Sequence, residues 1–464
     1  MDFNKRIDDM KDELIKSTQE ILKIRSVAEE PCGEGKPFGE GVALCLETAL
    51  KISEELGFKT ANIDGYAGYA ELGEGDEYVA VLGHLDVVPE GDGWMYPPYG
   101  AEIHDGKIYA RGTLDDKGPI MAALYALKAI KDSNVKLSKR VRIIFGTNEE
   151  NGSTEIEHYL SKEKPPVAGF TPDADFPIIY AEKGITMFKV VKDINIKQSS
   201  NTKINYIKGG QRPNMVPDYC EAEVVSDNTA SLESCAIEFA NEKGYEFKTE
   251  TRDDMLIIKC YGVSAHGSTP ELGKNAVMQL LSFLGTLNIG KCDAADFINF
   301  FNKYVGMEIH GESFGVYLED EPSGKLSFNV GAINITEDKA SITLNLRYPV
   351  TYKYEDMMEP FNRRIEEIGL KVEDMIHQKP LYYPENHPLI KTLQKVYAEQ
   401  TGQRATLLAI GGGTYAKEMP NIVAFGPIFP GKPNLDHQVN EYIEVDDLIL
   451  NAKIYAHAIY ELAK

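Results

Sequence analysis

The sequence is short of cysteine and of long apolar runs, and both shortages restrict the class of protein. Its 464 residues include six cysteines, none in a C-x-x-C pair, which argues against a disulfide framework. No apolar stretch approaches the roughly 18 residues of a membrane-spanning helix. The segment Met1–Lys16 alternates in charge and lacks an apolar signal-peptide core. We therefore expect a protein of the reducing cytoplasm with no membrane partner.

Basic residues are also scarce. Lys and Arg number 49 against 72 Asp and Glu, which gives a formal net charge of -23. Such a surface repels phosphate backbones, so nucleic acid is not an expected partner. The phosphate-binding pattern G-x-x-x-x-G-K-[ST] is absent from the sequence, which argues against a P-loop ATPase.

The pattern of strands and helices predicts an interrupted domain. Over residues 1–183, apolar strands alternate with helices, which predicts an α/β fold with a mixed, mostly parallel sheet and flanking helices. Residues 184–380 contain strands of alternating polarity, which predicts an inserted α+β domain with an antiparallel sheet. Buried strands are expected again at 406–410 and 422–425. Residues 381–464 would therefore complete the first domain.

One stretch, Tyr78–Pro89, places two polar side chains at the end of a core strand. The apolar run Tyr78–Leu82 predicts a parallel strand buried on both faces. His84 and Asp86 follow it, and they project to the same side because side chains alternate along extended chain. Open α/β sheets carry their sites at this end of the strands.

Four later segments of the same domain bring acidic or histidine side chains to the ends of strands or helices. They are Asp115-Asp116, Glu149-Glu150, Asp173 and Asn434-Leu435-Asp436-His437. Two histidines with several carboxylates suit zinc, manganese or cobalt. Because carboxylates can bridge, the set suggests two ions about 3.5–4 Å apart that share a hydroxide and polarise a carbonyl.

These motifs carry a resemblance to a known family. GHLDVVP, ARGTLDDKG, GTNEENGS and NLDHQVNE, with the isolated Asp173, resemble the motifs of the dinuclear zinc exopeptidases, which include aminoacylases, carnosinases and PepV-type dipeptidases. SAHGSTPELGKNA, GQRPNMVP and IGGGTYAKEMPN extend the resemblance over nearly the whole chain. The length and the large insertion are most similar to those of PepV-type dipeptidases.

The resemblance implies a metal-dependent dipeptidase in which a water bridging two divalent ions attacks the peptide bond. Zinc is the expected metal, with manganese or cobalt as alternatives. His84 and Asp173 would hold one ion. Glu150 and His437 would hold the other, and Asp115 would bridge both.

The resemblance also implies roles around the metal ligands. Glu149 would be the general base, and Asp86 would accept a hydrogen bond from the ring N–H of His84. The inserted domain would act as a lid, on which His266 stabilises the oxyanion. Residues implied to bind the substrate carboxylate are Asn214, Arg347, Gly412, Gly413 and Thr414.

Substrate and assembly follow from the same resemblance. We expect dipeptides as substrates and a monomer, because an enlarged lid can close over its own site; a dimer is the alternative. A second hypothesis is an N-acyl amino acid deacylase of the same family. A third is a non-catalytic peptide-binding protein, against which Glu149 and the full ligand set argue.

Overall fold

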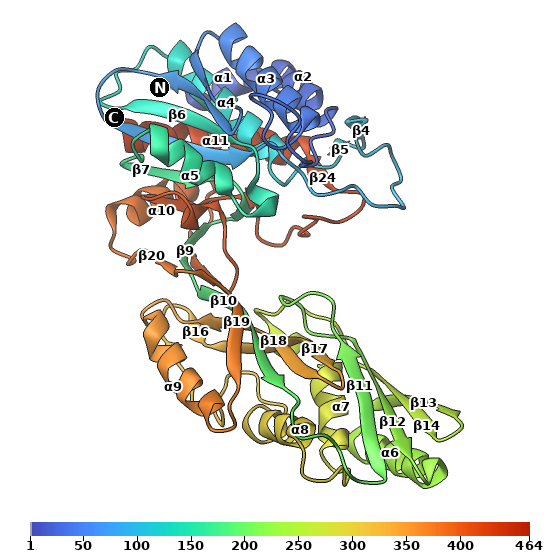
Figure 1. Cartoon of the computed structure of the whole chain (residues 1–464). Helices are drawn as coiled ribbons and strands as arrows, with labels where there is room; N and C mark the ends of the chain where they lie inside the picture. Colours follow the sequence, from blue (N-terminus) through green and yellow to red (C-terminus); the bar gives the residue numbers. More distant parts are fainter. Residues whose placement is uncertain (1) are drawn as a thin grey trace. The chain divides into compact units, whose positions relative to one another are not determined.

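The computed structural model describes residues 2–464, which divide into two compact units (Figure 1). Unit 1 comprises Met1–Tyr180, Tyr383–Leu408 and Gly413–Lys464, and unit 2 comprises Ala181–Tyr382 and Ala409–Gly412. The first unit is thus built from separate stretches of the chain, and unit 2 lies between them in the sequence. Across residues 2–464, no helix is both long enough and apolar enough to cross a membrane.

The larger sheet is mixed, and most of its strands lie within unit 1. Its strands, in spatial order, are β1 (Lys59–Ile63), β2 (Ala67–Leu72), β6 (Arg140–Gly146), β3 (Tyr78–His84), β7 (Ala168–Thr171), β22 (Ile422–Ala424), β9 (Ile178–Glu182) and β20 (Leu381–Tyr382), and β21 (Leu407–Ile410) pairs with β9 off this path. The central strands β6, β3, β7 and β22 run parallel. The strands flanking them are antiparallel.

The sequence pattern explains which strands form the centre. Every residue of β3 is buried, as its continuous apolar run predicts for a strand covered on both faces. The predicted α/β fold class is confirmed. A strand forms at the predicted place, β21, but the prediction that it is buried is wrong. It pairs off the main path of the sheet, and its Ala409 is exposed.

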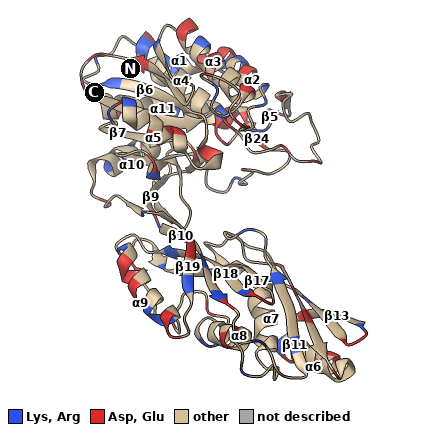
Figure 2. Cartoon of the chain, in the orientation of Figure 1, with Lys and Arg blue, Asp and Glu red and all other residues tan. Residues whose placement is uncertain are grey.

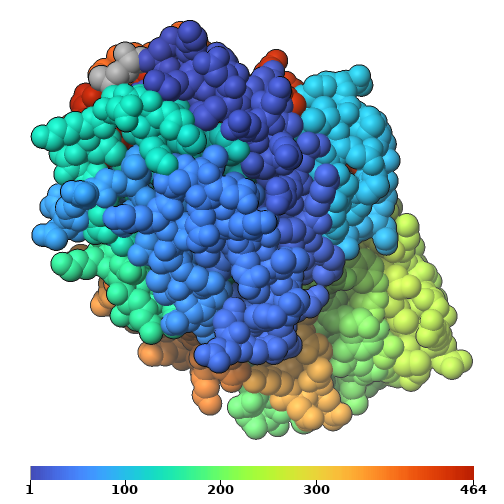
Figure 3. Space-filling view, turned by 90° about the horizontal axis from the view of Figure 1, so that it is seen from above, coloured from blue at the N-terminus to red at the C-terminus, as the bar shows by residue number. Residues whose placement is uncertain are grey.

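Helices surround this sheet. They are α1 (Phe3–Asp9), α2 (Lys11–Leu22), α3 (Glu40–Glu55), α4 (Lys117–Asp132), α5 (Thr154–Lys162), α10 (Pro388–Thr401) and α11 (Val445–Ala463). Helix α4 is buried along most of its length and contacts α2, α11 and β3. In Figure 3 the N-terminal segments, in blue, cover much of one face of unit 1.

Smaller elements of unit 1 lie near the ends of the central strands. An antiparallel group contains β4 (Glu102–His104), β5 (Lys107–Tyr109) and β24 (Tyr442–Glu444), and β8 (Ala174–Asp175) pairs in parallel with β23 (Pro427–Ile428). Short 3₁₀ turns are η1 (Glu149–Asn151) and η3 (Tyr415–Lys417). Pairing of β24 with β5 connects the C-terminal part of the chain to the segment that precedes Asp115.

Unit 2 is an antiparallel sheet with helices packed against it. Its strands, in spatial order, are β13 (Glu246–Arg252), β14 (Met255–Tyr261), β12 (Tyr219–Ser226), β11 (Thr202–Gly209), β17 (Ser327–Ile335), β18 (Lys339–Tyr348), β10 (Gly184–Asp193) and β19 (Lys371–Gln378). Its other elements are α6 (Thr229–Lys243), η2 (Pro270–Leu272), α7 (Ala276–Leu284), α8 (Asp293–Tyr304), α9 (Tyr354–Glu366) and the strand pair β15 (Glu319–Asp320) and β16 (Gly324–Lys325). The strands show the alternating burial expected of a sheet with one covered face, as in β12. Lys and Arg residues are interspersed with Asp and Glu residues along the ribbon of each unit (Figure 2).

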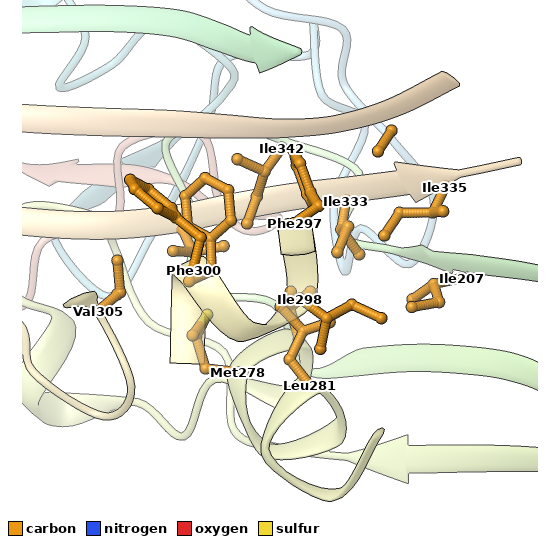
Figure 4. Close-up of a cluster of buried hydrophobic side chains, with 14 of the residues drawn as sticks. Ile207, Met278, Leu281, Phe297, Ile298, Phe300, Val305, Ile333, Ile335 and Ile342 are labelled. Atoms are coloured by element: carbon orange, nitrogen blue, oxygen red, sulfur yellow. The ribbon is translucent and has the colours of Figure 1, made fainter. Parts of the chain in front are cut away.

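The core of unit 2 lies between this sheet and helices α7 and α8 (Figure 4). Phe297 of α8 is fully buried there, with its ring centroid 4.9 Å from that of Phe301. We expect Phe297→Ala to lower the free energy of unfolding by about 3–5 kcal/mol, because it removes a large buried side chain and leaves a cavity. Urea unfolding measures the change.

The matched control is Ile237→Ala on α6, whose side chain is 44% exposed. Its cost should stay within about 0.5 kcal/mol, as for other surface substitutions. Equal costs for Phe297→Ala and Ile237→Ala would contradict this account of the core.

Candidate active site

A single carboxylate, that of Asp115, connects two histidines in unit 1. Asp115 Oδ1 lies 2.8 Å from His84 Nε2, and Asp115 Oδ2 lies 3.0 Å from His437 Nε2. His84 Nε2 is also 3.8 Å from Asp173 Oδ2, and His437 Nε2 is 3.1 Å from Glu150 Oε2. The five predicted metal ligands therefore gather around one bridging group, although they come from distant parts of the sequence.

The spacing of these atoms fits metal ligands. Two ligands at the 2.0–2.1 Å bond lengths of tetrahedral zinc are about 3.3 Å apart, and the distances above bracket that value. His84 Nε2 is buried and, within residues 2–464, has no hydrogen-bond partner of suitable geometry, despite the nearby Asp115. Imidazole nitrogens and carboxylate oxygens are donors for zinc, manganese or cobalt. The residues present fit a divalent metal centre.

The tautomer of His84 supports the same assignment. His84 Nδ1 lies 2.9 Å from the backbone carbonyl of Asp86. A carbonyl only accepts hydrogen bonds, so Nδ1 carries the proton in the neutral ring and Nε2 presents its lone pair to the cluster.

The Asp86 carboxylate has a different partner from the one predicted. It accepts hydrogen bonds from the backbone N–H groups of Glu149 and Glu150, each at 3.1 Å. Its distance to His84 Nδ1 is 3.5 Å, so the backbone carbonyl of Asp86 replaces its carboxylate as the acceptor for the ring. The resemblance implied the carboxylate as the acceptor for the ring; the structure directs the carboxylate to the two N–H groups at the start of the η1 turn, which have no partner within the turn.

The two glutamates of η1 lie close to the ligands. Donor atoms of His84, Glu149 and Asp173 lie within 4.8 Å of one another, and so do those of His84, Asp115 and Glu150. Geometry alone therefore allows either glutamate to bind metal.

The electrostatics of the cluster reflect an excess of negative charge. Burial raises the pKa of Glu149 well above its usual value, and the charge of Asp173 raises it further. Burial and then Asp115 raise the pKa of Glu150 to about 7. Contacts with Asp115 and Glu150 raise the pKa of His437 to about 11. Without a metal ion, bound protons offset the negative charge of the cluster. A divalent cation would displace these protons and offset the charge itself.

Unit 2 assembles another part of the predicted set. The backbone N–H of Gly267 donates to the carbonyl of Asn214 at 2.7 Å, which holds the loops carrying Asn214 and His266 together. Arg347 of β18 is buried and donates to the carbonyl of Gly411 at 2.5 Å. Burial, followed by the charge of Arg347, lowers the pKa of His266, so the two side chains share one electrostatic environment. Burial lowers the pKa of Arg347 to about 10, and the guanidinium remains charged at neutral pH.

The glycine-rich segment falls on the boundary between the units. Gly412 belongs to unit 2, whereas Gly413 and Thr414 belong to unit 1. The Thr414 hydroxyl accepts a hydrogen bond from the N–H of Ala416 at 3.1 Å. Thr414 therefore caps the start of η3.

Two buried carboxylates outside the predicted set lie near the metal-ligand cluster. Glu441 is fully buried, and its position in the NLDHQVNE motif, four residues after His437, was the available signal. Glu155 is also fully buried and accepts a hydrogen bond from Tyr415, whose ring contacts His84 edge-on with centroids 6.0 Å apart. Nothing local in the sequence marks Glu155, because it reads as an ordinary residue of helix α5.

Two histidines joined by one carboxylate, with further carboxylates beside them, at the end of β3 of an α/β sheet define a metallohydrolase-type centre. The pattern of Peptidase family M20/M25/M40 matches residues 80–461, and the chain belongs to this family. A similar protein is "Putative dipeptidase YtjP" of Bacillus subtilis (strain 168), 44% identical over 458 residues, with 98% of each chain covered. The family resemblance expected from the motifs is confirmed.

Solved structures share the fold. Human carnosine dipeptidase 1 is 16% identical with a TM-score of 0.58, and the match covers 99% of this chain and 98% of that one. The Bacillus subtilis YXEP protein, described as a dinuclear metal binding peptidase of the M20 family, is 12% identical with a TM-score of 0.51. That match covers 98% of this chain and 99% of the other.

Proposed function

We propose that this protein is a dipeptidase that hydrolyses the peptide bond of short unblocked peptides with two divalent ions, zinc before manganese or cobalt. The observation that carries the proposal is the position of Asp115, with one oxygen beside His84 and the other beside His437. The name of its Bacillus subtilis relative points to the same activity.

Unit 1 supplies the groups for metal binding and proton transfer in this proposal. His84 and Asp173 would hold one ion, Glu150 and His437 would hold the other, and Asp115 would be shared between them. When bound, the ions would polarise the scissile carbonyl and make water a stronger nucleophile. Glu149 accepts the proton from that water and passes it to the leaving amine. The Asp86 carboxylate fixes the Glu149-Glu150 turn by accepting hydrogen bonds from the backbone N–H groups of both glutamates.

Unit 2 acts as the lid in this proposal. Its His266 donates a hydrogen bond to the oxygen that becomes negative as the carbonyl is attacked. Arg347 offers a planar fork that suits the substrate carboxylate. The other residues proposed to bind that carboxylate are Asn214, Gly412, Gly413 and Thr414.

Compartment and assembly are part of the proposal. The six cysteines are all free thiols in the described part of the chain, which agrees with a reducing cytoplasm. We infer that the protein is a monomer, because its lid needs no second chain to be complete. Its binding partners in the cell are then its dipeptide substrates.

Substrate class is tested by comparing a dipeptide such as Ala-Ala with N-acetyl-alanine, each with added Zn²⁺ or Mn²⁺. We expect kcat/KM for the dipeptide to be at least about 10²-fold higher, because a site built to pair a free ammonium leaves polar groups unpaired when the amine is acylated. Steady-state assays of both compounds measure the ratio.

A matched control is the blocked dipeptide N-acetyl-Ala-Ala, which keeps the scissile bond and the free carboxylate. It should be hydrolysed as poorly as N-acetyl-alanine. A preference for N-acetyl-alanine would identify a deacylase instead, and turnover of none of the three would contradict both assignments.

A further inference from the structure

Glu441 is a buried carboxylate whose oxygens both accept hydrogen bonds from the segment that carries Asp115. Oε1 accepts from the backbone N–H groups of Leu114 at 2.8 Å and Asp115 at 3.3 Å. Oε2 accepts from the N–H of Gly112 at 3.0 Å and from Arg111 Nη1 at 2.7 Å. One side chain therefore satisfies most of the donors of a loop that forms neither helix nor strand.

The chemistry of these contacts requires an ionised carboxylate. Every partner is a donor, and only a carboxylate can accept at both ends. An amide would present its own N–H groups to donors at one end. Arg111, only 2% exposed, supplies the opposite charge, so the buried Glu441 is paired and hydrogen-bonded.

The position of Glu441 joins two ligand-bearing segments. It follows His437 by four residues, and it holds the loop that ends in Asp115. Asp115 presents one oxygen to His84 and the other to His437. A shift of the 112–115 backbone would therefore change both distances together, whereas the β3 strand that carries His84 would stay in place.

We propose that Glu441 is a positioning residue that sets the bridging geometry of Asp115 relative to His437, and thereby the affinity for the second of the two ions. This inference rests on the proposed metal centre, and it goes beyond that centre because Glu441 has no place among the ligands. Glu441 acts on the metal only through Asp115 and His437.

The test is Glu441→Gln, with Mn²⁺ alone as the probe. Calorimetric titration should show that the weaker Mn²⁺ step loses about 10–100-fold in affinity, the usual effect of removing a group that holds a metal ligand. Electron paramagnetic resonance at saturating Mn²⁺ should show a changed exchange-coupled signal, because the coupling depends on the distance and the bridging groups between the two ions. In dipeptide assays kcat should fall while KM stays within about twofold.

The chain offers a matched control for simple destabilisation. Glu71 of β2 accepts from Arg140 Nη1 at 2.6 Å and Arg142 Nε at 2.7 Å, in the same unit and with little exposure. Glu71→Gln should lower the melting temperature and leave Mn²⁺ affinity and the coupled signal unchanged. If Glu441→Gln behaves in the same way, Glu441 is structural only and the inference is wrong.

Trp94, the only tryptophan of the chain, gives an independent readout. Its ring lies 5.3 Å from the guanidinium of Arg111, the ion-pair partner of Glu441. We expect its fluorescence to change in Glu441→Gln and to stay the same in Glu71→Gln. Unchanged emission in both variants would show that the Arg111 segment has not moved, which contradicts the inference.

A second variant keeps the charge in case the amide variant fails to fold. Glu441→Asp still neutralises Arg111, but its side chain is one methylene shorter and cannot reach both ends of the loop. It should lower affinity at the weaker Mn²⁺ step by about tenfold, toward the lower limit for such groups. Wild-type affinity in Glu441→Asp would overturn the inference. Because these readouts need no substrate, they remain decisive even if the protein cleaves no dipeptide.

Discussion

Replacing Glu149 with glutamine should lower kcat for dipeptide hydrolysis by about 10²–10⁴-fold, the usual contribution of a general base, and leave two metal ions bound. Glutamine has the shape of glutamate but cannot accept a proton. The backbone N–H of Glu149, which donates to Asp86 at 3.1 Å, is unaffected, so the η1 turn should persist. Steady-state kinetics and metal analysis of the same preparation measure both quantities.

Two comparison variants separate the base from a ligand. Glu150→Gln should lose metal, because Glu150 lies 3.1 Å from His437 Nε2 in the second half of the cluster. Glu157→Gln, an exposed position on α5, should behave as wild type. If Glu149→Gln loses metal as readily as Glu150→Gln, then Glu149 is a ligand. If Glu149→Gln remains fully active, the assigned base is wrong.

The sequence predicts those parts of the site that follow directly from local pattern. The apolar run before His84 indicates a buried strand, and β3 ends at His84 as that pattern requires. The turn at Asp105-Gly106 has both residues at positive φ, which these residue types favour in a tight hairpin. The motifs were enough to group His84, Asp115 and His437 through the family resemblance; strand-end geometry accounts for His84 alone, because Asp115 and His437 lie in loops outside the parallel strands.

Long-range contacts were not accessible to the same reasoning. The partner of the Asp86 carboxylate is the backbone of a turn more than 60 residues away, so alternation along one strand could not identify it. Glu441 ends the NLDHQVNE motif, but its burial and its contacts with the 112–115 loop are visible only in the structure. The exposure of β21 depends on its place off the main sheet path, which no local pattern specifies.

Replacing Asp115 with asparagine is expected to remove the second ion and nearly all activity. The two oxygens of Asp115 face different histidines, at 2.8 and 3.0 Å, and an amide can offer only one oxygen. Loss of a group that merely orients a ligand already costs about 10–100-fold in metal affinity, so loss of the shared ligand should cost more. Metal analysis after dialysis and a Mn²⁺ titration measure the effect.

Stability gives a readout of Asp115 that needs no substrate. A metal at 100 times its dissociation constant stabilises the folded state by about 2.7 kcal/mol, which for a unit of this size raises Tm by roughly 5–10 °C. In Asp115→Asn most of this metal-induced shift should disappear. Asp105→Asn, the same change at an exposed hairpin turn where asparagine tolerates positive φ, should keep the full shift. A full metal-induced shift in Asp115→Asn would mean that the ion is held elsewhere, because no other carboxylate here presents one oxygen to each histidine of the cluster within the described residues.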